Sequence, residues 1–276
     1  MQIRFQNSPI ETRQMTTQEL RSNFLVDVLI TDDQLQLVYS HYDRVITGGA
    51  KPVGSKLELE NDPELRAGFF LERREIGIIN VGGIGTIEAD GENFTLNKLD
   101  CLYLGKGIKQ VLFLSNSKQD PAVYFLLSAP AHTTYPNRKL SKEEASPVSL
   151  GEIATANQRT IYKYIHTDGI KSCQLVMGLT VLNNGSVWNT MPPHTHTRRM
   201  EAYFYFDVQD QHRVFHFMGE PNQTRHLLIA NHQAILSPPW SIHSGAGTSN
   251  YSFIWGMAGE NYNFTDMDQV AITELL

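Results

Sequence analysis

The sequence predicts an all-β protein made of two duplicated β-barrels with a few short peripheral helices. In the first half, short apolar runs at residues 25–30, 35–39 and 45–46 follow one another with turn residues between them. This spacing is typical of a barrel or a sandwich and leaves no room for alternating helices. The second observation is a similarity between the two halves of the chain, which indicates one barrel in each half.

Three segments predict the other elements. Residues 16–19, Thr-Thr-Gln-Glu, form a capping-box pattern ahead of apolar residues, so we expect a short helix there. The glycine-rich residues 80–85 look superficially like a phosphate-binding loop, but residues 86–88 continue as a strand, which indicates a barrel turn. Residues 265–276 carry the pattern of a capped amphipathic helix, which we expect on the outside of a barrel.

The repeat is specific in two segments. Residues 68–75 align with residues 194–201, and residues 104–110 align with residues 237–243. The histidines of the second copy have no counterpart in the first, because Gly68, Phe70 and Gln110 stand in the positions of His194, His196 and His243.

The polar residues 136–147 are bracketed by prolines and predict a linker between the halves. We therefore expect an N-terminal barrel without metal ligands at residues 1–150. The metal site would lie in a C-terminal barrel at residues 151–276.

Potential metal ligands gather in the second copy. His194 and His196 are two residues apart, so their side chains share a face only on a strand. Glu201 lies an odd number of residues beyond His196, so the chain must turn or bulge to bring it to the same face. His243 follows the proline-rich residues 238–242, which would start a new strand. Such a set suits a divalent first-row metal with one open position, although histidine pairs at this spacing also arise by chance.

These motifs resemble the paired motifs of the cupin superfamily, with a departure at Trp240, where that superfamily usually has glycine. A closer resemblance, to the 5-keto-4-deoxyuronate isomerase family, extends over nearly the full chain. It is carried by the runs at residues 70–75, 129–136, 188–192, 198–206 and 241–245. It implies a zinc-binding bicupin, described as hexameric, that interconverts 4-deoxy-L-threo-5-hexosulose uronate and 3-deoxy-D-glycero-2,5-hexodiulosonate in pectin breakdown.

The same resemblance implies the metal and its ligands. One Zn²⁺ per subunit would be held by His194, His196, Glu201 and His243, and Fe²⁺, Mn²⁺ or Ni²⁺ remain open. An isomerisation of this type moves a proton from the carbon next to a carbonyl, and a divalent ion can stabilise the enediolate that forms.

No single general base stands out in the sequence. The candidate catalytic residues are Glu201, which could alternate between ligand and base, and Tyr203 and Tyr205, which could donate to the substrate or only fill the barrel. His132 is a further candidate. The substrate carboxylate requires a cation; three arginines lie near the motifs, although arginines at such positions often form ordinary ion pairs: Arg198, Arg199 and Arg225.

The composition and charge of the chain argue against nucleic acid and membranes as partners. A net charge of −6 gives no basic field that would attract nucleic acid. No apolar run reaches membrane-spanning length and the N-terminus lacks a signal-peptide core, so we expect a cytoplasmic protein without a membrane partner. Two other functions stay open: an iron-dependent cupin oxygenase, because the same ligands hold Fe²⁺, and a non-catalytic cupin in which the metal only stabilises the barrel.

Overall fold

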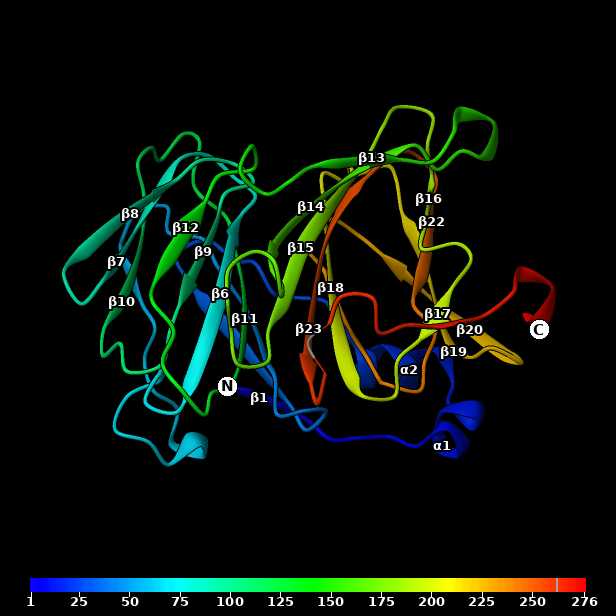
Figure 1. Ribbon diagram of the computed structural model, residues 1–276, viewed down its shortest axis with the longest axis horizontal. Coiled ribbons are helices and arrows are strands. Elements are labelled where there is room, and N and C mark those ends of the chain that lie inside the picture. The colour runs from blue at the N-terminus through cyan, green and yellow to red at the C-terminus, as the bar shows by residue number, and fades with distance from the viewer. Residues whose placement is uncertain (262) are drawn as a thin grey trace.

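The computed structural model covers residues 1–276 and describes all of them except residue 262. It contains two β-barrels side by side (Figure 1). In the first barrel a seven-stranded sheet and a four-stranded sheet enclose an apolar core. In spatial order, the larger sheet contains β1 (Gln2–Arg4), β3 (Leu35–Ser40), β4 (Ile46–Ala50), β11 (Tyr124–Pro130), β6 (Arg74–Asn80), β9 (Cys101–Leu104) and β12 (Arg138–Leu140), and the smaller contains β5 (Leu57–Glu58), β10 (Val111–Ser115), β7 (Gly85–Ala89) and β8 (Glu92–Leu96).

The second barrel repeats this order position for position, which confirms the duplicated all-β fold. Its larger sheet contains β13 (Val148–Leu150), β14 (Arg159–Ile165), β15 (Val176–Leu182), β23 (Ser252–Gly259), β18 (Arg199–Phe206), β21 (Ala234–Ser237) and β2 (Leu25–Val26), and its smaller sheet contains β16 (Trp188–Asn189), β22 (Ser244–Gly247), β19 (Val214–Glu220) and β20 (Gln223–Ile229). A separate short pair joins β17 (His194–Thr195) to β24 (Asp268–Gln269).

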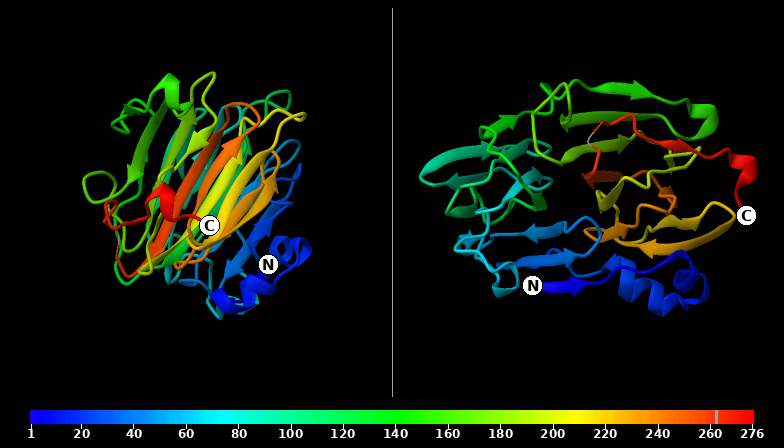
Figure 2. Two further views of the ribbon diagram at one scale, coloured as in Figure 1. Left: turned by 90° about the vertical axis from the view of Figure 1, so that its right-hand side faces the viewer. Right: turned by 60° about the horizontal axis from the view of Figure 1, so that its bottom comes forward.

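The N-terminal segment crosses to the second barrel (Figure 2). Helix α2 (Thr17–Phe24) begins with the predicted capping box, and a second capping box starts the unpredicted helix α1 (Pro9–Gln14). Strand β2 then pairs with β21 at the edge of the larger sheet. It is shorter than the strand predicted at residues 25–30, because the chain leaves this edge after Val26. The division at residue 150 stays a prediction, since strands from both sides of that boundary share the second barrel.

Two expectations about connecting segments are wrong. Residues 265–276 do not form an amphipathic helix: they contain β24 and the 3₁₀ turn η3 (Ile272–Glu274), because residues 268–269 pair with the edge of β17. The predicted linker at residues 136–147 contains β12, whose pairing with β9 extends the first barrel. Two further 3₁₀ turns, η1 (Pro63–Leu65) and η2 (Ile153–Thr155), lie on the surface.

The two larger sheets pack against each other and form the centre of the molecule. Phe125 on β11 stacks on Phe204 on β18, with ring centroids 4.9 Å apart. Gly77 on β6 allows close approach, because a Cβ atom there would lie 2.7 Å from both Ile165 and Met177. The barrels therefore meet through buried apolar surface, which is the dominant stabilising contribution at such a contact. In the described part of the chain, no helix has the length and apolar character needed to cross a membrane.

Candidate metal centre

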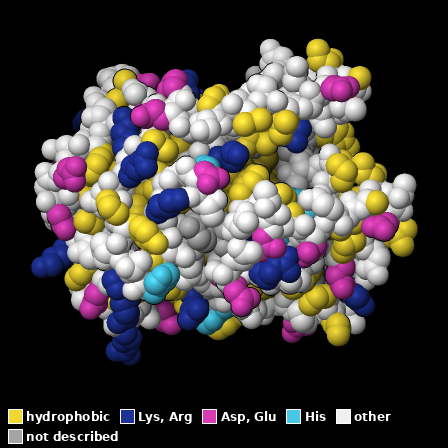
Figure 3. Space-filling model, in the orientation of Figure 1, with side chains coloured by type: hydrophobic (Ala, Val, Ile, Leu, Met, Phe, Trp, Pro, Cys, Tyr) yellow, Lys and Arg dark blue, Asp and Glu magenta, His cyan; other side chains and the backbone are white. Residues whose placement is uncertain are grey.

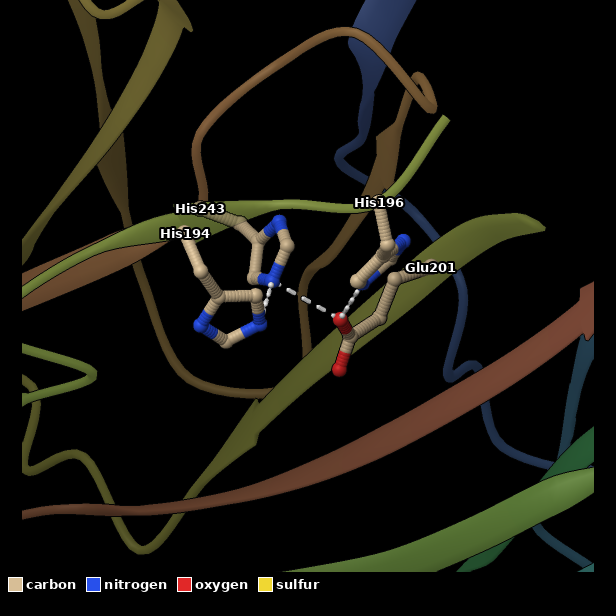
Figure 4. A group of neighbouring side chains, drawn as sticks. All are labelled: His194, His196, Glu201 and His243. Carbon is tan, nitrogen blue, oxygen red and sulfur yellow. Dashed lines mark hydrogen bonds and ion pairs between the residues drawn. The ribbon is translucent and has the colours of Figure 1, made fainter. Parts of the chain in front are cut away.

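Four side chains of the second barrel point toward one another (Figure 4). The nitrogen and oxygen atoms that His194, His196, Glu201 and His243 offer all lie within 4.8 Å of one another. Glu201 Oε2 lies 3.0 Å from His196 Nε2 and 2.9 Å from His243 Nε2, and His243 Nε2 lies 2.9 Å from His194 Nε2. His196, Glu201 and His243 are almost fully buried, and His194 is half-buried.

Local structure explains why these residues meet. The pair His194 and His196 begins on β17, and Arg199 N–H then donates to the His196 carbonyl, which closes a turn before β18. This turn brings Glu201 to the face of His196, as the odd spacing required. His243 is positioned by a second turn, in which Ser241 N–H donates to the Pro238 carbonyl. That turn forms despite the Trp240 departure.

The donor set fits a metal cation. His196 Nδ1 lies 2.9 Å from the Arg199 carbonyl oxygen, which can only accept, so Nδ1 carries a proton. In the neutral ring Nε2 is then a lone pair, and it faces the Glu201 carboxylate at 3.0 Å. Two acceptors at this distance require a cation or a proton between them. A hydrogen bond that fixes the tautomer through the distal nitrogen is usual for metal-ligating histidines.

Electrostatics favour the ligating forms of two residues. Burial, followed by the nearby His243, lowers the pKa of His194 from 6.5 to about 3, so its ring is neutral and can bind a metal. Burial alone would raise the pKa of Glu201, but positive charge at the facing imidazoles, first His243 and then His196, outweighs burial and holds this pKa below its usual range. Glu201 is therefore a carboxylate at neutral pH.

Two of the four ligands, His194 and Glu201, line a cavity of about 290 Å³ in the second barrel. His194, Glu201 and Tyr203 form one part of its wall, and apolar side chains form much of the rest. Figure 3 shows hydrophobic side chains around a hollow on this face of the molecule. The apolar residues are Ile161, Met191, Pro192, Phe253, Trp255, Met257, Phe264 and Met267. A metal with one open position would thus face a space of the size of a small molecule.

The predicted catalytic residues take different positions. Tyr203 lines the cavity, and its hydroxyl lies 3.3 Å from Thr190 Oγ1. Tyr205 is fully buried outside the lining, with its hydroxyl 2.7 Å from His216 Nδ1. Burial raises the pKa of both tyrosines well above 10, so both hydroxyls stay protonated. His132 is exposed, follows β11 of the first barrel and does not line this cavity.

Sequence reasoning missed part of the cavity wall. Phe264, Met267 and Gln269 come from the C-terminal segment, whose pairing with β17 could not be seen in a pattern that was interpreted as helical. No sequence motif marks His216, which is buried beside Tyr203, with ring centroids 5.4 Å apart. Burial lowers its pKa to about 3.

The three arginines considered for the substrate carboxylate are all engaged elsewhere. Arg198 binds Asp266 and Asp268, and Arg225 donates to carbonyls at the end of α1. Arg199 donates to the backbone carbonyls of Asn261, Asn263, Phe264 and Asp266. Arg159 lines the cavity instead and was not considered, because it lies far from the histidine motifs in the sequence.

The model of the KduI/IolB family matches residues 24–273. The chain belongs to this family. Two similar relatives are named 4-deoxy-L-threo-5-hexosulose-uronate ketol-isomerase: the protein of Shouchella clausii is 54% identical and that of Halalkalibacterium halodurans is 53% identical, each over 275 residues that cover 100% of both chains. Among solved structures, an IolB-like protein from Salmonella typhimurium LT2 matches with a TM-score of 0.67 at 17% identity, covering 88% of this chain and 96% of that one. The structural match shows the shared fold of this KduI/IolB member.

Proposed function

We propose that this protein is a ketol-isomerase that converts 4-deoxy-L-threo-5-hexosulose uronate to 3-deoxy-D-glycero-2,5-hexodiulosonate. The observation that carries the proposal is the position of the four ligands. They converge beside a cavity of small-molecule size whose wall includes His194 and Glu201, in a chain similar over its whole length to proteins named for this reaction. We place the reaction in the cytoplasmic breakdown of pectin and related polyuronates.

The reaction moves a proton between two adjacent carbons of the substrate, and negative charge builds up on oxygen as the proton leaves. A divalent cation at His194, His196, Glu201 and His243 would stabilise that charge. Zinc suits this nitrogen-rich set, and Fe²⁺, Mn²⁺ and Ni²⁺ have compatible ligand preferences. We propose one Zn²⁺ per chain.

The protein's own residues would handle the proton. Glu201 directs one carboxylate oxygen at the imidazoles and the other away from them (Figure 4), so the second oxygen is free to accept a proton from the substrate carbon. The Tyr203 hydroxyl stays protonated and can donate to a substrate oxygen in the cavity. Tyr205 lies behind this wall, where it holds His216. The apolar lining excludes water and strengthens these interactions.

A direct assay tests the proposed reaction. The purified protein should form the 2,5-diketo product without added nicotinamide, flavin or oxygen. Chelation should stop turnover and zinc should restore it. In deuterium oxide, a proton-transfer route should place solvent deuterium in the product, whereas a hydride shift would leave none. Oxygen consumption coupled to product formation would indicate an oxygenase, and chelation that lowers the melting temperature with no turnover under any metal would indicate a structural metal.

We also propose that the protein assembles as a homohexamer. A first barrel without the histidine ligands retains a complete fold, and burying one of its faces between subunits would account for that retention. Light scattering at micromolar concentration should show a species of six chains. A monomer at that concentration would contradict the proposed assembly.

A further inference from the structure

The cavity beside the metal ligands contains a cation that has no anionic partner among the described residues. Among its described lining residues, Arg159 and Arg199 carry a guanidinium. Arg199 is almost fully buried, and its donors reach the carbonyl oxygens of Asn261, Asn263, Phe264 and Asp266. Both terminal nitrogens of Arg199 are therefore committed to the protein backbone, which leaves Arg159 as the guanidinium whose Nη2 has no partner among the described residues.

Arg159 is placed to face the cavity. It is the first residue of β14, and its side chain shares a face with Ile161, which also lines the cavity. The Arg159 side chain forms one hydrogen bond to a described residue, from Nη1 to the Asn157 carbonyl oxygen, at 2.9 Å. No carboxylate of the described residues forms an ion pair with it, although it is half-buried. Burial lowers the pKa of this guanidinium, because desolvation is not offset by an anion.

Arg159 and the metal ligands lie at opposite sides of the cavity. The larger sheet runs in the order β14, β15, β23, β18, so three inter-strand spacings, roughly 14 Å at about 4.8 Å each, separate Arg159 from β18 across the sheet. The register places Arg159 in a row that reaches β18 near Phe206, so the backbone of Glu201 lies a further distance of roughly 17 Å along the strand, at about 3.3 Å per residue. Both side chains reach inward and shorten this gap. Phe253, Trp255 and Met257 line the cavity from β23, the strand next to β18. The site thus offers a metal-binding end and a cationic end with an apolar wall beside them.

We propose that Arg159 binds the carboxylate of the substrate and so directs the opposite, carbonyl-bearing end to the metal ligands. This inference rests on the proposed function and names the residue that makes the protein selective for a uronate over a neutral sugar. The planar guanidinium can donate two parallel hydrogen bonds to a carboxylate, which fixes the orientation of the ligand as well as its charge. Arg159 is a binding and positioning residue, and the proton transfer stays with the groups at the other end.

The test combines a change in the protein with a change in the substrate. Arg159→Met should lower kcat/KM for the uronate roughly 10- to 100-fold, mainly through KM, because a hydrogen-bonded charge pair is lost. The kcat/KM of Arg159→Lys should fall between those of wild type and Arg159→Met, since lysine keeps the charge but lacks the planar guanidinium. The matched control Arg138→Met, at an exposed position of β12, should behave as wild type.

The neutral amide of the substrate supplies the decisive comparison. Wild type should turn it over as poorly as Arg159→Met does, and the variant should not distinguish the acid from the amide. If Arg159→Met prefers the acid as strongly as wild type does, the inference is wrong. Urea unfolding of each variant separates a folding defect from lost binding, and Arg159→Lys covers the case in which the methionine variant does not fold.

A binding measurement keeps this inference separate from the proposed reaction. Calorimetric titration with D-galacturonate and with D-galactose should show tighter binding of the acid to wild type, and no such preference in Arg159→Met. If wild type does not isomerise the hexosulose uronate but shows this preference, the proposed function fails and the carboxylate site stands. If wild type binds both sugars equally, or binds neither, the carboxylate site is overturned.

Discussion

At the scale of single residues, the four ligands are held with unequal support. The His196 ring is held by a hydrogen bond at the nitrogen that points away from the other ligands, because its Nδ1 donates to the Arg199 carbonyl. His243 has no such support among the described residues, since its Nδ1 is buried without a hydrogen-bond partner. Its position depends on the backbone, where Ile242 N–H donates to the Gly219 carbonyl. A ligand without a distal hydrogen bond binds through the metal itself, so His243 should be sensitive to metal loss.

Removing a ligand should therefore empty the site. One metal ion per chain is expected in the wild type, and elemental analysis should find it. His243→Ala should lower both metal content and activity, the latter by more than roughly 100-fold, because three ligands hold the ion weakly and misplace it. The double change His194→Ala with His196→Ala should remove the ion. A second ion bound by the first barrel would contradict the repeat, because Gly68, Phe70 and Gln110 cannot replace the histidines.

A single histidine outside the site should control part of the acid sensitivity. Burial, followed by the charge of Lys51, lowers the pKa of His232 from 6.5 to about 4 in the folded protein. Below pH 6.5 the unfolded chain takes up this proton first, so stability falls as the pH drops and levels off near pH 4. Between pH 7 and pH 5, the free energy of unfolding of His232→Asn should fall by about 2 kcal/mol less than that of wild type, as measured by urea unfolding. Asparagine suits the positive φ of 62° at this position. Equal losses in the two proteins would contradict the assignment.

At the scale of elements, the C-terminal segment closes the cavity and depends on two adjacent arginines. Arg199 lies in β18 and donates to carbonyls of the segment, and Arg198 pairs with Asp266 and Asp268 near the surface. The segment then continues as β24, which pairs with the strand that carries His194. These contacts tie the cavity wall to the same turn that positions the metal ligands.

The two arginines should differ sharply when each is replaced. Arg199→Met should destabilise the protein by roughly 3 kcal/mol, because several partly buried carbonyls lose a charged donor. Arg198→Met should cost less stability, since its ion pairs with Asp266 and Asp268 are only partly buried and partly buried ion pairs near the surface contribute little. Urea unfolding compares the two, and limited proteolysis should show faster cleavage near residues 261–266 in the Arg199 variant. Similar behaviour of both variants would mean that Arg199 does not hold this segment.

At the scale of the whole molecule, the sequence predicted the features that depend on local patterns better than the features that depend on long-range contacts. The histidine spacing, the odd offset of Glu201 and the capping box at Thr16 are short-range signals, and the structure confirms the elements that they indicated. The place of β2 in the second barrel depends on contacts more than two hundred residues apart, which no local pattern records. No local pattern records the pairing of β24 with β17 either, and this pairing overrides a helical pattern. Arg159 reaches the cavity only through the order of strands in the sheet, which no local pattern records.

The repeat also explains how the two barrels are joined. Glu75 on β6 occupies the position that Glu201 has on β18, and without histidines around it this carboxylate serves another purpose. It is fully buried and accepts hydrogen bonds from the backbone N–H groups of Cys173, Gln174 and Leu175, at 2.7–3.1 Å, all in the second half of the chain. The Tyr103 hydroxyl donates to it as well, at 2.7 Å. One copy of the glutamate is placed to hold a metal, and the other holds the loop that precedes β15.

Glu75→Gln should test this clamp. An amide offers one oxygen acceptor instead of two, so at least one backbone N–H at residues 173–175 loses its partner in a buried site. We expect a loss of about 3 kcal/mol or more in the free energy of unfolding, because breaking a buried charged network leaves its remaining members unpaired. The exposed Glu92→Gln on β8 is the matched control and should unfold like wild type. Metal content should not change in either variant, since Glu75 does not contact the ligands. If Glu75→Gln unfolds at the wild-type urea concentration, the barrels are held by their apolar contact alone.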